Sequence, residues 1–186
     1  MTKRRPQRNR RRGVEIVEFT LVLLPLLGFT FLLLDLGWAV YKRATLQFAV
    51  REGCRFAITN RLVALTDANG KSYGMIDSVK SVVQSRAVGF LGSRTTDPGW
   101  ASIQVRFYNP STPTSALGAP VNCADTTAQP NIGGNLVEVS VENYQARALA
   151  PLLRSAAPLN FTARSSDRME GNPAAGAPRT FNGSCP

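Results

Sequence analysis

The sequence places an acidic residue, Glu18, at the start of an apolar helix, where its carboxylate needs a partner of opposite charge or contact with water. Residues 13–19 read Gly-Val-Glu-Ile-Val-Glu-Phe and separate a basic cluster from a run of apolar residues. An acidic side chain at the centre of a membrane helix costs about 2.5 to 3.5 kcal/mol. Glu18 therefore calls for a partner, whereas Glu15, closer to the basic cluster, is expected to be a surface charge. The alternative for Glu18 is a carboxylate that reaches the membrane surface and has no partner.

Groups suited to catalysis are sparse in the rest of the chain. The sequence has no histidine, which is the commonest general base and the commonest metal ligand. No closely spaced cysteine pair indicates zinc, and no glycine-rich phosphate loop follows a predicted strand. We expect no enzymatic activity, no cofactor and no metal.

The positive charge is concentrated at the N-terminus. Residues 1–12 hold seven basic residues and no acid, so they account for most of the net charge of +10. The charge thus belongs to a short leader and not to a basic domain face, and nucleic acid is not an expected partner. Beside an apolar segment, such a cluster predicts a cytoplasmic N-terminus and a C-terminal part outside the membrane.

A single long helix is predicted for residues 14–60. Residues 19–41 are apolar apart from Asp35, and about 20 such residues cross a lipid bilayer as a helix. Asp35 would pair with Lys42 or Arg43, or only with water. Apolar residues then recur every three or four positions over 42–59, which indicates an amphipathic continuation. We expect Asn60 to end it.

The remaining residues, 61–170, predict a small extracytoplasmic α+β domain. Residues 75–90 have helical spacing, and three segments alternate between apolar and polar residues, which is typical of an antiparallel sheet with one face on a core. The three predicted strands are residues 102–108, 136–142 and 159–164. A long loop, 109–135, lies between two of these strands. We expect poor order in the tail, 171–186.

Three cysteines are present. Cys123 lies in the long loop and Cys185 in the tail, and a disulfide between them would hold both segments if the domain is in an oxidising compartment. The alternative is three unpaired thiols. Cys54 lies on the apolar stripe of the long helix, where it would act as a small hydrophobic residue.

Three segments resemble those of TadE-like proteins, pseudopilins of the tight-adherence (Tad/Flp) pilus system. They are Arg12-Gly13 followed by Val14-Glu15-Ile16-Val17-Glu18-Phe19, then Asp35-Leu36-Gly37, and Val50-Arg51-Glu52-Gly53-Cys54-Arg55-Phe56-Ala57. Cys54 departs from the alanine usual in the family. The resemblance is strong over residues 11–60. It is weaker over 137–141, 151–153 and 163–170, which are similar to the family's closing strands.

The resemblance implies that a membrane prepilin peptidase removes the leader, residues 1–13, by cutting between Gly13 and Val14. The new amine of Val14 in one subunit would pair with Glu18 of a neighbour, with Phe19 packed beside it, so these residues would serve assembly. The implied fold is a long transmembrane and amphipathic helix followed by a pilin-like domain. The implied partners are other pilin and pseudopilin subunits and the inner-membrane pilus assembly platform, with the C-terminal domain in the periplasm.

Two other functions remain compatible with the residues. One is an uncleaved, single-pass anchored module for periplasmic binding or adhesion. The other is an exported protein that a signal peptidase releases from its apolar segment. The three hypotheses differ in the size of the mature chain.

Overall fold

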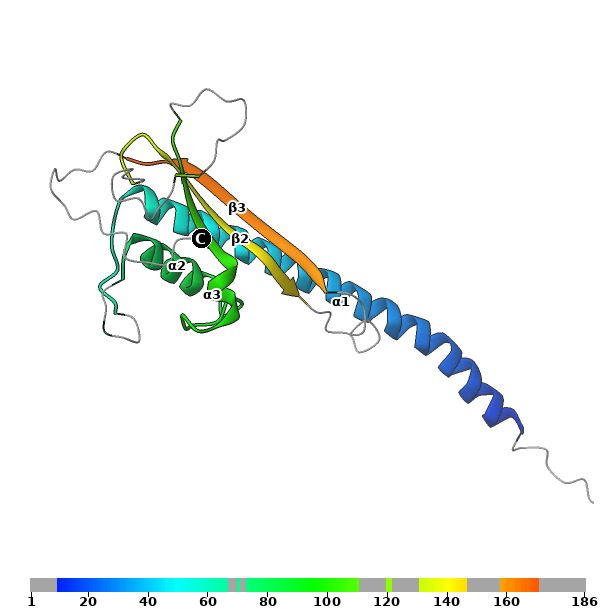
Figure 1. Cartoon of the computed structure of the whole chain (residues 1–186). Coiled ribbons are helices and arrows are strands. Elements are labelled where there is room, and N and C mark those ends of the chain that lie inside the picture. Colours follow the sequence, from blue (N-terminus) through cyan, green and yellow to red (C-terminus); the bar gives the residue numbers. More distant parts are fainter. Residues whose placement is uncertain are drawn as a thin grey trace, which may run out of the picture. The chain divides into compact units, whose positions relative to one another are not determined.

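The computed structural model describes residues 10–66, 70, 73–110, 120–121, 131–146 and 158–170. They form helices α1 (Arg10–Ile58), α2 (Met75–Arg86) and α3 (Pro98–Ser102) and strands β1 (Ile103–Tyr108), β2 (Leu136–Ala146) and β3 (Leu159–Arg168) (Figure 1). The predicted α+β fold, with its long N-terminal helix and antiparallel sheet, is confirmed. Two compact units share α1. Its residues up to Val40 belong to the first, and those from Tyr41 belong to the second, together with α2, α3 and the sheet.

The sheet is antiparallel, with its strands in the order β1-β2-β3. The core face carries the apolar residues that alternation predicts. Cross-strand pairs on it are Ile103 with Val141, Val105 with Val139, and Phe107 with Val137. All six side chains are buried. The predicted core positions of β3 are only partly confirmed, because Ala163 is buried, Phe161 is half-buried and Leu159 is exposed.

Strands β2 and β3 are longer than the alternating patterns predict. β2 passes through a bulge between Val141 and Tyr144, where Asn143 has a φ of +56°, and then pairs again as far as Ala146. A bulge shifts the alternation by one residue, so the period-2 pattern stops there although the strand continues. β3 runs to Arg168, which lies opposite Leu136 at the start of β2.

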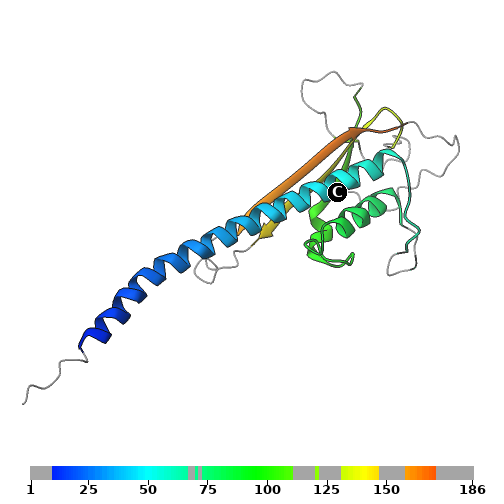
Figure 2. The same ribbon diagram turned by 180° about the vertical axis from the view of Figure 1, so that it is seen from behind.

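One face of the sheet is covered by α2 and by the part of α1 that follows Tyr41 (Figures 1 and 2). The buried stripe of α1 consists of Leu46, Ala49, Val50, Gly53, Cys54 and Ala57. Leu36, Val40 and Ala44 continue the same apolar spacing toward the N-terminus, but they are exposed. Two of these three precede the second unit, whose core begins beyond Tyr41. Lys42, predicted as a polar spacer, is buried instead.

The predicted helix 75–90 is too long at its C-terminal end. α2 ends at Arg86, and the chain turns through Val88 at a φ of +51° and Gly89 at +81°. Glycine adopts this left-handed conformation readily, whereas a β-branched residue is strained there by about 1 to 2 kcal/mol. The short helix α3 was not predicted. It follows Asp97, whose carboxylate accepts hydrogen bonds from the backbone N–H groups of Ser93 (2.7 Å) and Arg94 (2.9 Å).

The part of α1 in the second unit is tied to β3 and to the residues that follow β3. Gln47 Nε2 donates a hydrogen bond to the carbonyl oxygen of Arg164 (2.9 Å), and the N–H of Glu170 donates to the carbonyl oxygen of Ile58 (3.1 Å). Asn60 follows with a φ of +52°, which confirms its predicted role as the stop signal of the helix. Most of the predicted loop 109–135, the whole of the tail 171–186 and both Cys123 and Cys185 lie outside the described residues.

Candidate processing and assembly site

The predicted cut site and the predicted assembly residues all lie on α1. The helix begins at Arg10 and continues without interruption through Gly13, Val14, Glu18 and Phe19. We predicted a helix start at residue 14, and the additional turn means that the bond between Gly13 and Val14 is helical in the uncut chain. Apart from the adjacent residues and backbone of α1, no described atom lies within 4 Å of the place that a β-carbon of Gly13 would occupy.

Helix geometry places Glu18 one turn after Val14. Residues four apart on an α-helix share a face and are separated by about 6 Å along the axis. A cut after Gly13 would make Val14 the first residue of the helix, with a free amine beside the N–H groups that have no acceptor at a helix start. A carboxylate in this first turn is favoured by the helix dipole. The spacing therefore allows Glu18 to pair with such an amine.

The surroundings of Glu18 are exposed and apolar. Val14 is 67 % exposed and Phe19 is 65 % exposed, and Glu18 itself is exposed. Among the described residues, no ion pair includes Glu18. Within the described part of the chain, the carboxylate thus lacks the compensation that a lipid environment would demand of it.

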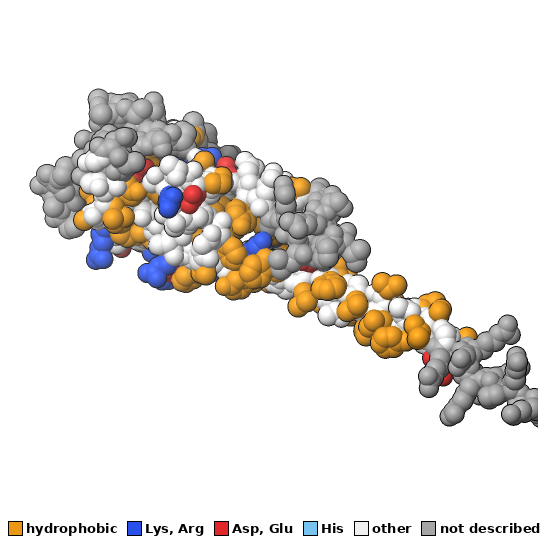
Figure 3. All heavy atoms as spheres, turned by 90° about the horizontal axis from the view of Figure 1, so that it is seen from below, with side chains coloured by type: hydrophobic (Ala, Val, Ile, Leu, Met, Phe, Trp, Pro, Cys, Tyr) orange, Lys and Arg blue, Asp and Glu red, His pale blue; other side chains and the backbone are white. Residues whose placement is uncertain are grey.

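The apolar half of α1 is a candidate membrane anchor. Residues 13–58 form the only described helix that is long and apolar enough to cross a bilayer, with a mean hydropathy of 2.3 in its most apolar window. Its large hydrophobic side chains are exposed, and Figure 3 shows them gathered along this part of the helix. The structure contains no membrane, so the orientation of the anchor stays a prediction.

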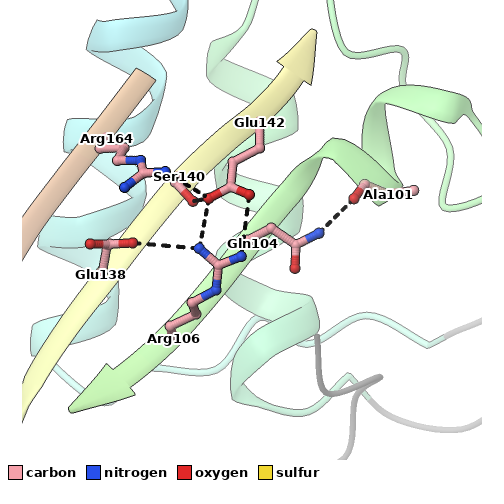
Figure 4. A network of polar contacts seen from close by, with 7 residues as sticks. All are labelled: Ala101, Gln104, Arg106, Glu138, Ser140, Glu142 and Arg164. Carbon is pink, nitrogen blue, oxygen red and sulfur yellow. Dashed lines mark hydrogen bonds and ion pairs between the residues drawn. The ribbon is translucent and has the colours of Figure 1, made fainter. Parts of the chain in front are cut away.

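The largest described cluster of charges lies on the sheet face opposite the core (Figure 4). Arg106 on β1 donates two hydrogen bonds to the carboxylate of Glu142 on β2, at 2.6 and 3.2 Å. Glu138 lies 3.6 Å from the Arg106 guanidinium, and the Arg164 guanidinium on β3 lies 3.4 Å from Glu142. The hydroxyl of Ser140 lies 3.1 Å from the same carboxylate. This cluster joins all three strands.

Sequence reasoning placed several of these residues on the polar face of the sheet but missed the cluster. The pair Arg106 and Glu138 follows from the strand register, since the two residues lie directly opposite. The stronger pair, Arg106 and Glu142, is diagonal across the strands and needs side-chain reach that the register alone does not show.

The electrostatics of this cluster favour permanent charge. Hydrogen bonds from Arg106 lower the pKa of Glu142, and the hydrogen bonds to Glu142 raise the pKa of Arg106. A general acid or base works best with a pKa near the working pH. Both shifts lead away from neutrality, so the cluster is suited to holding the strands together and is unsuited to proton transfer.

Cys54 lies on the floor of an open cleft between α1 and β3. The cleft has a volume of about 360 Å³ and is also lined by Phe48, Arg51, Glu52, Arg55, Ser165 and Asp167. Cys54 is 2 % exposed, and its burial raises the pKa of the thiol to about 11. A thiol with such a pKa is not a nucleophile near neutral pH. The expectation that Cys54 acts as a small hydrophobic residue agrees with this environment.

These observations define a protein with one candidate membrane-spanning helix that continues into the core of a small α+β domain. Residues 13–55 match the model of a family described as TadE-like protein. The resemblance to TadE-like proteins is thereby confirmed over residues 13–55, and it associates the chain with Tad pilus assembly in general. The resemblance of the C-terminal segments stays a prediction. Neither the comparison with curated proteins nor that with solved structures finds a match.

Proposed function

We propose that the protein is a minor pilin-like membrane component, a pseudopilin, that takes part in assembly of a tight-adherence pilus or its secretion apparatus. The observation that carries the proposal is Glu18, which lies five residues after Gly13 on an exposed apolar helix. The match of residues 13–55 to TadE-like proteins supports it. The protein acts through its contacts and is not an enzyme.

In this proposal, a prepilin peptidase cuts between Gly13 and Val14. The basic leader keeps the cut site at the cytoplasmic face of the inner membrane, because positive residues remain on that side. The domain after Tyr41 lies in the periplasm. The Glu18 carboxylate pairs with the new amine of Val14 in a neighbouring subunit, which compensates a charge that lipid would otherwise leave unpaired.

A second candidate function is an uncleaved anchored module for binding or adhesion. One observation favours it: α1 begins at Arg10, so the bond after Gly13 lies inside a continuous helix. A peptidase would have to act on a locally opened helix or before this part of the helix forms.

The decisive experiment is the N-terminal sequence and the intact mass of the protein taken from the membranes of its own host. A chain that starts at Val14 supports the pseudopilin proposal. A chain that starts at Met1 or Thr2 favours the uncleaved module and removes the proposed partner of Glu18. A chain that has also lost residues 19–41 identifies an exported protein.

A further inference from the structure

The loop between α2 and α3, residues 87–97, presents an apolar tip between two cations. Val88 is 67 % exposed, and Arg86 and Arg94 are exposed on either side of it in the sequence. Val88 also has a left-handed backbone conformation, with a φ of +51°. Val88 is exposed and therefore contributes nothing to the core of the domain. Backbone strain at such a residue is often associated with a functional contact.

This loop contacts the first residues of the second unit, Tyr41 and Lys42. The ring of Phe90 packs edge-on against that of Tyr41, with centroids 5.8 Å apart. The ammonium group of Lys42 lies 5.8 Å from the centre of the Phe90 ring. Tyr41 is the last residue of the predicted span, 19–41. Tyrosine at the end of such a span is typical of the interface between lipid and water.

The loop is held in one conformation by polar contacts. Gln84 Nε2 donates hydrogen bonds to the carbonyl oxygens of Leu91 and Arg94, both at 3.0 Å. The Asp97 carboxylate accepts two backbone hydrogen bonds, which lower its pKa. It is therefore engaged within the loop, and residues 86–94 contain no acid of their own.

A polar cleft of about 250 Å³ opens beside the tip. It is lined by Ser81, Gln84, Ser85, Gly89, Gly92 and Ser93. Serine hydroxyls bind phosphate oxygens readily. The surface thus combines an apolar tip, two exposed guanidinium groups and hydroxyl groups, which is the chemistry that an anionic lipid headgroup and the adjacent acyl boundary require.

We propose that residues 86–94 form a second membrane contact, in which Val88 enters the interfacial region of the bilayer and Arg86 and Arg94 bind the phosphates of anionic lipids. The proposed binding partner of this surface is the lipid of the bilayer next to Tyr41, where the chain leaves the membrane. The proposal rests on α1 spanning the membrane and not on a role in pilus assembly. The contact would hold the domain at the membrane surface through two points.

The test uses the full chain in vesicles, with its three cysteines replaced (Cys54→Ala, Cys123→Ser and Cys185→Ser) and one fluorophore attached through Val88→Cys. Ile132→Cys is the matched control, because Ile132 is also an exposed apolar turn residue. Ile132 lies near the C-terminal end of α1. The N–H of Met169 donates a hydrogen bond to the Asn135 carbonyl in the same turn, and the N–H of the next residue, Glu170, donates to the carbonyl of Ile58. α1 rises about 25 Å between Tyr41 and Ile58, so this control lies far from the loop.

Vesicles of phosphatidylcholine and phosphatidylglycerol carry a nitroxide on the lipid headgroup as quencher. We expect several-fold stronger quenching at position 88 than at position 132. Quenching at 88 should fall when phosphatidylglycerol is omitted or when Arg86→Glu and Arg94→Glu are introduced together. Equal quenching at the two positions, or none at position 88, would overturn the proposal.

Hydrogen exchange of the unmodified chain provides a second measurement that does not depend on the substitutions. In nanodiscs that contain phosphatidylglycerol, the amides of residues 87–94 should exchange more slowly than in detergent micelles. Protection that increases with the number of protein copies per disc would assign the surface to a second copy of the chain and overturn the lipid contact. Unchanged exchange would overturn it as well.

Discussion

Gly53 of α1 faces Val83 of α2 so closely that a β-carbon at position 53 would overlap the Val83 side chain. The same position also lies against Val139 of the sheet. Two helices and a sheet therefore meet at a residue without a side chain. This contact gives a structural reason for the glycine in the segment Arg51-Glu52-Gly53, which lies within the match to TadE-like proteins.

Gly53→Ala should destabilise the second unit. Alanine favours a helix over glycine by about 1 kcal/mol, but overpacking a tight core costs about 1 to 3 kcal/mol. We expect a net loss of about 1 kcal/mol in the free energy of unfolding, measured by denaturant titration in detergent. Gly37→Ala is the control, because nothing lies within 4 Å of its missing β-carbon. Adding Val83→Ala should recover part of the loss, and a fully additive double variant would contradict the contact.

Glu142→Gln should remove a pH-dependent part of the stability. The pKa of Glu142 lies below its ordinary value of 4.5 because Arg106 donates hydrogen bonds to its charged form. A carboxyl group whose pKa is lowered by folding stabilises the native state above its unfolded pKa, and this stability is lost as the pH falls through the folded pKa. The variant should be less stable by about 1 kcal/mol at pH 7, and the difference should shrink as the pH falls from 4.5 through the lower folded pKa of Glu142.

The measurement for this prediction is thermal unfolding followed by circular dichroism across that pH range. Glu170→Gln is the control, because Glu170 is exposed and belongs to none of the described ion pairs. A constant difference between Glu142→Gln and the unmodified chain at all pH values would show that the loss does not arise from the charge.

Gly13→Leu should block removal of the leader. A side chain at this position would fill space that is open on α1 and would obstruct a peptidase that accepts only glycine before the cut. The intact mass should then include residues 1–13, whereas Gly28→Leu, farther along the helix, should be processed. A product of the same mature size from Gly13→Leu would exclude the proposed cut site.

Glu18→Val should leave membrane insertion intact and abolish pilus assembly. The substitution makes α1 more apolar, so insertion should be retained, but it removes the carboxylate one turn after Val14 that is proposed to pair with the amine of a neighbouring subunit. Membrane fractionation and electron microscopy of pili measure the two effects separately. Glu15→Val is the matched control and should retain pili. Normal piliation with Glu18→Val would contradict the pairing role.

Val88→Asn should stabilise the second unit. Asparagine tolerates the left-handed conformation that valine adopts here at a φ of +51°, so about 1 kcal/mol of backbone strain should be released. Thermal unfolding in detergent, away from any bilayer, measures this gain. Ile132→Asn, at another exposed apolar position, should show no such gain. A loss of stability with Val88→Asn would indicate that the valine side chain supports the fold.

Periodicity predicted α1, the core positions of β1 and the first half of β2, because each of these elements buries one face in a regular pattern. Periodicity predicted the wrong ends of α2 and β2, where the backbone departs from regular helix or strand geometry. Val88 and Gly89 end α2 although Phe90 continues the helical spacing. The bulge at Asn143 hides the second half of β2.

Tertiary contacts explain the other differences. Lys42 lies between the apolar positions of α1, where a charged residue is expected at the surface, and the sequence pattern gives no particular role to Lys80. Both lysines are nevertheless buried. Each ammonium group lies near an aromatic ring, Phe90 and Trp100 respectively. These rings come from segments that are distant in the sequence, so local spacing could not reveal the pairing. The pKa of Lys80 is lowered by its burial.

The hydrogen bond from Gln47 to the Arg164 carbonyl has a practical consequence for protein production. Strand β3 is an edge of the sheet, and an edge with open backbone groups recruits strands from other molecules. Gln47 occupies one such group from within α1, and α1 also covers the core face. A soluble fragment that starts after α1 would expose an aggregation-prone edge and an apolar surface at once. Fragments for solution work should therefore retain α1 from Tyr41 onward.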